Sequence, residues 1–172
     1  MIEYIYMDVL GMLKYLPRAI LIGIPLSLSA VFVANAWQRK RGGGACSVSR
    51  TVIFGFYLAV LFFITFFSRE SGSRVGVDLV LFSTWGINDR NNAFVIENVL
   101  LFIPYGFVSC LAFKRLRDFV RCTVFGMATS LCIECLQLIT GRGYFQLDDI
   151  LTNTLGAMLG FLVYLILFGK KT

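Results

Sequence analysis

The chain has 172 residues, of which 58% are hydrophobic and only 15% are charged. Soluble domains are nearer half apolar and a quarter charged, so this composition argues against an ordinary soluble enzyme and against a disordered chain. The length leaves room for about five membrane spans of roughly 20 residues each, joined by short loops. A net charge of +6 often suggests a nucleic-acid-binding protein. Its meaning here depends on where the basic residues lie relative to the apolar runs.

The chain begins with an apolar stretch, residues 1–15, that is interrupted by Glu3, Asp8 and Lys14. This pattern predicts either a helix lying at the membrane interface or the start of the first span. Five longer apolar runs follow, and each is about long enough to cross a bilayer, the second only marginally. We predict spans over residues 16–37, 51–67, 93–113, 120–139 and 150–168.

These five runs offer too few polar faces to coat a soluble helix bundle. The first run contains Pro17 and Pro25 and ends in basic residues, without a small-residue cleavage site, so we interpret it as a span and not as a signal peptide. The predicted fold is all-α: a polytopic membrane helix bundle that forms one domain over residues 1–172.

The longest connection, residues 68–92, has no strong periodicity. An apolar patch over residues 75–82 is interrupted by Gly76 and Asp78, and Trp85 follows it. A short re-entrant or interfacial segment is expected there.

Basic residues concentrate after the first, third and fifth predicted spans, on one side of a five-span chain. They are Arg39, Lys40, Arg41, Arg50, Lys114, Arg115, Arg117, Arg121, Lys170 and Lys171. Only Asp118 is acidic in these segments, so the positive-inside rule predicts that they are cytoplasmic. The N-terminus is then outside and the C-terminus inside. The net positive charge reflects topology, and no nucleic-acid partner is expected.

Histidine is absent, which removes the commonest general base and the commonest metal ligand. None of the five cysteines lies in a predicted outer loop, so no disulfide framework is expected. Cys132 and Cys135 form a C-x-x-C inside a span, without a second pair or a histidine to complete a metal site. We therefore predict no metal and no cofactor.

Polar side chains gather near the predicted outer ends of spans two to five, which suggests a shared pocket that opens outward. Ionisable groups within spans are costly and usually face a protein interior or a wet cavity. Candidate binding residues are Ser68, Arg69, Glu97, Asn98, Phe102, Glu134, Gln137, Arg142, Asp148, Asp149 and Asn153. Arg69 and Arg142 are suited to an anionic group.

Some of these candidates have a structural alternative to a role in binding. Ser68, Asp148 and Asp149 could merely cap or terminate helices, and the same holds for Glu97 and Asn98, since acids are favourable at helix N-termini. Glu134 lies near a helix C-terminus, so it would need Arg69 or Arg142 as a partner, or a bound proton. Gly156 and Gly160, three and seven residues after Asn153, favour close helix packing.

Several of these positions resemble a known family. Asn98, Phe102, Pro104 and Gly106 match the N-x-x-x-F-x-P-x-G signature of the VanZ-like membrane proteins. Further matches are Ser68, Arg69, Ser130, Ile133, Glu134, Gln137, Gly141, Arg142, Asp148, Asp149, Asn153 and Gly156. The resemblance covers roughly residues 60–165, and Gln146 departs from it because the family often has an acid there.

The resemblance implies a multi-pass protein of the bacterial cell membrane and an association with resistance to the glycopeptide teicoplanin. The leading hypothesis is an outward pocket that recognises an amphiphilic antibiotic or a lipid-linked envelope component, with membrane lipids around it and protein partners unknown. A membrane enzyme acting on an envelope lipid or glycan is the alternative, with Glu134, Asp149 and Glu97 as candidate catalytic carboxylates. A lipid or antibiotic transporter is a third hypothesis, which the apolar inner halves of the spans disfavour.

Overall fold

Six α-helices and two short strands make up the computed structural model, which describes residues 1–40, 48–67, 69, 72 and 74–169. The helices are α1 (Ile2–Leu13), α2 (Leu16–Lys40), α3 (Val48–Phe62), α4 (Asp89–Ala112), α5 (Phe119–Ile139) and α6 (Leu147–Phe168). A π-helical turn, η1 (Phe63–Phe67), continues α3, and a short 3-10 turn, η2 (Lys114–Leu116), joins α4 to α5.

Five helical segments within the described residues are long and apolar enough to cross a membrane. Each coincides, within a few residues, with one predicted span, and the marginal second span is completed by η1. The predicted helix bundle is therefore confirmed, while the orientation of its termini stays a prediction.

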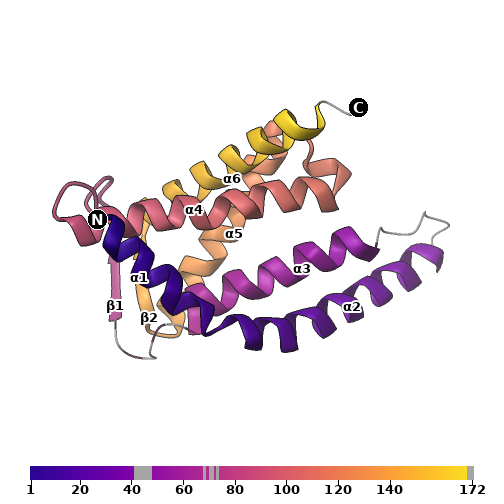
Figure 1. Ribbon diagram of the computed structural model, residues 1–172, viewed down its shortest axis with the longest axis horizontal. Helices are drawn as coiled ribbons and strands as arrows, with labels where there is room; N and C mark the ends of the chain where they lie inside the picture. Colours follow the sequence, from indigo (N-terminus) through magenta and orange to yellow (C-terminus); the bar gives the residue numbers. More distant parts are fainter. Residues whose placement is uncertain (41–47, 68, 70–71, 73, 170–172) are drawn as a thin grey trace.

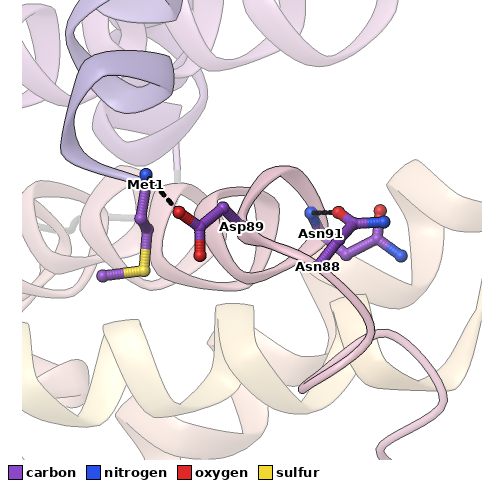
Figure 2. A network of polar contacts seen from close by, with 4 residues as sticks. All are labelled: Met1, Asn88, Asp89 and Asn91. Atoms are coloured by element: carbon purple, nitrogen blue, oxygen red, sulfur yellow. Dashed lines mark hydrogen bonds and ion pairs between the residues drawn. The ribbon is translucent and has the colours of Figure 1, made fainter.

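Local sequence explains where two of the long helices begin. The Asn88 side chain accepts a hydrogen bond from the backbone N–H of Asn91 at 2.8 Å and so caps α4 (Figure 2). Asp118 caps α5 in the same way, accepting from the N–H of Arg121 at 3.1 Å. Such caps satisfy backbone donors that have no partner within the helix.

The closest helix packing is between α4 and α6, which lie side by side in Figure 1. A Cβ on Gly160 would overlap the carbonyl oxygen of Ile103, and a Cβ on Gly156 would overlap that of Val99. The glycines therefore let the two backbones approach closely, as small residues do in membrane helices.

The outward faces of the bundle are apolar as well as its interior. The buried apolar cluster consists of Phe54, Leu61, Phe102, Tyr105, Val108, Ile133 and Ala157. On the outside, Ile139 and Ile166 are 80% and 81% exposed. A bundle that is apolar on both sides is suited to a lipid environment.

A two-stranded sheet is the feature that the sequence analysis did not anticipate. Strands β1 (Arg74–Asp78) and β2 (Arg142–Gln146) pair in parallel, with Arg74 opposite Arg142 and Asp78 opposite Gln146. A parallel pair needs a long crossover, which α4 and α5 supply. The segment that we expected to be re-entrant or interfacial thus begins as a strand.

The sheet lies at the end of the bundle where α1 and the N-terminus are found, and the C-terminal end of α6 lies at the opposite end (Figure 1). We call the first of these the cavity end, for the cavity described next.

Candidate functional site

A cavity of about 580 Å³ lies at the cavity end of the bundle. Its wall is formed by α1, η1, the segment that follows β1, the first turns of α4 and α6, and strand β2. Four of the predicted binding residues line it: Arg69, Glu97, Asn98 and Asp149. These side chains come from three parts of the chain. Arg69 follows η1, Glu97 and Asn98 both lie on α4, and Asp149 lies in the first turn of α6.

Arg69 connects this cavity with a buried polar layer beneath it. Its Nη1 donates a hydrogen bond to Oε1 of Gln137 at 3.3 Å. A Cβ on Gly143 would lie 2.5 Å from the same nitrogen, so the guanidinium rests against the bare backbone of β2. Arg69 is also close enough to interact electrostatically with Glu134 and Asp149.

Two carboxylates share the cavity wall but have different surroundings. Asp149 is 7% exposed and lies beside the Asn98 amide. Glu97 faces Asp8 and Arg90, and its Oε1 is buried without a hydrogen-bond partner among the described residues. A buried oxygen without a hydrogen-bond donor is costly, so a ligand that donates a hydrogen bond to the Oε1 of Glu97 would be stabilised there.

Helix α1 forms a rim of the cavity and is tied to α4 by charge. Arg90 forms a salt bridge with Asp8 at 2.8 Å, and its guanidinium lies 4.5 Å from the centroid of the Phe94 ring. The Met1 ammonium lies 3.0 Å from the Asp89 carboxylate (Figure 2). The first residues of the chain therefore close one side of the site.

Glu134 and Gln137 lie in the layer beneath the cavity and do not line it. Glu134 is 2% exposed, and its Oε2 accepts a hydrogen bond from the backbone N–H of Gln146 at 2.9 Å. Gln137 is 1% exposed, and its Nε2 donates to the Thr65 carbonyl at 2.8 Å. These two side chains of α5 fix the end of β2 and the π-helical turn η1.

Arg142 was expected to meet an anionic group or to pair with Glu134, and the structure places it elsewhere. Its Nη1 donates to the carbonyl oxygens of Arg69 and Phe66, at 2.7 and 3.3 Å, and its guanidinium lies over the Phe66 ring. Phe66 lies in the last turn of the helix and Arg69 just beyond it. The last carbonyl groups of a helix have no partner within it, so Arg142 supplies a donor for two carbonyls at this helix end.

Asp148 also has a structural position. It is 5% exposed, and its carboxylate accepts hydrogen bonds from the backbone N–H groups of Phe82 and Thr84, at 2.6 and 3.0 Å. It therefore holds the segment that follows β1 against the start of α6. This differs both from the expected pocket role and from simple capping.

Phe102 and Asn153 do not line the cavity either. Phe102 is fully buried in the apolar core. Asn153 is 4% exposed and donates to Oγ of Ser130 at 2.9 Å, which links α6 to α5. Ser68 lies outside the described residues.

Much of the cavity wall was not predicted from the sequence. Acidic and basic lining residues that were not predicted are Asp8, Lys14, Asp78 and Arg90. The Ser83 hydroxyl and the Val80 N–H donate to the Asp78 carboxylate and lower its pKa below the ordinary value. The interrupting charges in the N-terminal stretch were the one available signal, because charges in an apolar helix need a polar neighbour.

The charge balance of the wall suits a ligand with polar groups of both signs. The cations are Lys14, Arg69 and Arg90, and the anions are Asp8, Asp78, Glu97 and Asp149. Within the described parts of the chain, no group of three or more cysteines and acids is placed to hold a metal ion.

The fold and the cavity define a multi-pass α-helical membrane protein with a polar site at one end of its bundle. The VanZ/LLP1 family matches residues 54–168, and the chain belongs to this family. It is similar to Protein VanZ of Enterococcus faecium, with 36% identity over 70 residues. That stretch covers 41% of this chain and 43% of the relative, and no solved structure matches. The family match leaves out α1 and α2.

Proposed function

We propose that the protein acts in the bacterial cell membrane, where its cavity opens outward and binds the polar part of an amphiphilic antibiotic or of a lipid-linked envelope component. Binding of teicoplanin, and a contribution to resistance against it, is the specific form of this proposal. The observation that carries it is the 580 Å³ cavity that brings Arg69, Glu97 and Asp149 together.

The geometry suggests a role for each side chain. Arg69 would donate to a carboxylate or phosphate of the ligand, because a guanidinium binds such groups with two parallel hydrogen bonds. The unpartnered Oε1 of Glu97 would accept from an amine, amide or hydroxyl group. Asn98 and Asp149 would supply the other polar groups of the cavity wall beside Arg69 and Glu97.

Resistance measurements in a teicoplanin-susceptible host test the proposal. Arg69→Ala and Glu97→Gln should each return the inhibitory concentration to that of the empty vector, while the protein still accumulates in membranes. Loss of one charge-assisted hydrogen bond weakens binding by about tenfold or more.

Arg18→Ala and Glu3→Gln are the matched controls. Both residues are exposed and neither lines the cavity, so resistance should stay at the wild-type level. Unchanged resistance in both cavity variants would contradict the proposal.

A second candidate is an enzyme that acts on an envelope lipid or glycan. It is favoured by the presence of Glu97 and Asp149 on one cavity wall, since paired carboxylates can serve as acid and base. Glu134, the other candidate, lies beneath that wall. Purified protein incubated with a lipid-linked wall precursor, with and without chelator, should then yield a product by mass spectrometry that Asp149→Asn abolishes.

A further inference from the structure

A hydrophobic loop lies next to the cavity and outside the five spans. We call residues 79–87, between β1 and α4, the apolar loop. Its large apolar side chains are each between 48% and 72% exposed: Leu79, Val80, Leu81, Phe82, Trp85 and Ile87. The loop contains no charged residue. A contiguous apolar patch of this kind marks a surface that contacts lipid or protein.

Three backbone N–H groups of the apolar loop donate hydrogen bonds to side chains of α4 and α6. Asp148 accepts hydrogen bonds from the N–H groups of Phe82 and Thr84, and Asn92 Oδ1 accepts from the N–H of Gly86 at 2.7 Å. Phe82 has φ of +62°, which is strained for an aromatic residue and persists only where surrounding bonds maintain it. The large apolar side chains of the loop are exposed on the outside.

Position favours lipid as the partner of this surface. The loop leads through Asn88 into α4, which is one of the helices long and apolar enough to cross a membrane. It lies at the same end of the bundle as α1 (Figure 1), and α1 also exposes Ile2, Tyr6 and Met7. Tryptophan and tyrosine beside aliphatic residues at the end of a span are typical of the membrane interface.

We propose that the apolar loop inserts into the bilayer leaflet at the cavity end and, with α1, places the cavity rim at the depth of the lipid headgroups. Ser83, Thr84 and Ile87 belong both to the loop and to the cavity wall. An amphiphile anchored in that leaflet can therefore bring its polar part into the cavity while its chain stays in lipid. This last consequence rests on the proposed function, and the insertion itself does not.

Tryptophan fluorescence tests the insertion because the chain has only two tryptophans. Trp37→Phe leaves Trp85, in the loop, as the single reporter. The variant is reconstituted in phosphatidylcholine–phosphatidylglycerol vesicles that contain lipids brominated near the headgroup end of the acyl chain. We expect about a twofold loss of Trp85 emission and little quenching by aqueous acrylamide, as for an interfacial tryptophan.

Strong quenching by acrylamide together with none by brominated lipid would overturn the proposal, because the loop would then be in water. Protection from both quenchers that disappears when the protein is diluted in lipid would also overturn it, because the partner would be a second copy of the chain. Phe82→Ser in the same background should reduce the lipid quenching. If lipid quenching is found but resistance survives in Arg69→Ala, insertion stands and the proposed function fails.

Discussion

At the level of single residues, polar side chains at the cavity end of this bundle have two different kinds of role. Arg69, Glu97 and Asp149 line the cavity, whereas Glu134 and Gln137 bind backbone groups beneath it. All five are polar groups near span ends, so their residue types alone do not separate them. The hydrogen-bond partners of each side chain do.

Glu134 offers a test that separates support from catalysis. Glu134→Ala leaves the Gln146 N–H without its acceptor, so the free energy of unfolding should fall by about 1–3 kcal/mol. Glu134→Gln keeps an oxygen acceptor in the same place and should retain stability and resistance. Unfolding of the purified variants in detergent measures the stability difference. Loss of function in a stable, folded Glu134→Gln protein would instead mean that the carboxyl group itself is needed.

At the level of elements, contact between α4 and α6 positions Glu97 and Asn98 relative to Asp149. Gly160→Val would drive a branched side chain into the Ile103 carbonyl, so unfolding should become easier by about 1–3 kcal/mol, as in other overpacked sites. Gly11→Ala is the control, because a Cβ there meets nothing within 4 Å and stability should change by less than about 1 kcal/mol. Thermal unfolding in detergent gives both values, and equal stability of the two variants would refute the close-packing account.

Helix α1 adds an element to the site that lies outside the family match. Its Asp8, together with Arg90 of α4, closes one side of the cavity. Relatives that share residues 54–168 can therefore share the floor of the site and differ at this rim. Under the proposed function, ligand preference within the family should vary with the sequence of this helix.

At the level of the whole molecule, the span pattern was predictable because the signal is local. Runs of about 20 apolar residues indicate membrane helices whatever their neighbours are. Glu97, Asn98 and Asp149, which line the cavity, were singled out for a related reason, because ionisable and polar groups at span ends usually face a protein interior or a wet cavity.

What could not be predicted depends on contacts between distant parts of the chain. The pairing of β1 with β2 joins segments separated by two helices, and five-residue strands have a weak pattern of their own. Arg142 was assigned to the pocket by residue type, but its position beside the Phe66 carbonyl follows from the π-helical turn, which the sequence does not reveal. The place of α1 over the cavity is likewise a tertiary contact.

Direct binding of teicoplanin to the protein in lipid nanodiscs is the measurement that tests the central claim most directly. We expect saturable binding that Arg69→Ala weakens by about tenfold or more, since a charge-assisted contact is lost, and that Arg18→Ala leaves unchanged. A glycopeptide without an acyl chain should bind more weakly than teicoplanin. Absence of saturable binding, or binding that Arg69→Ala and Arg18→Ala affect equally, would contradict the account.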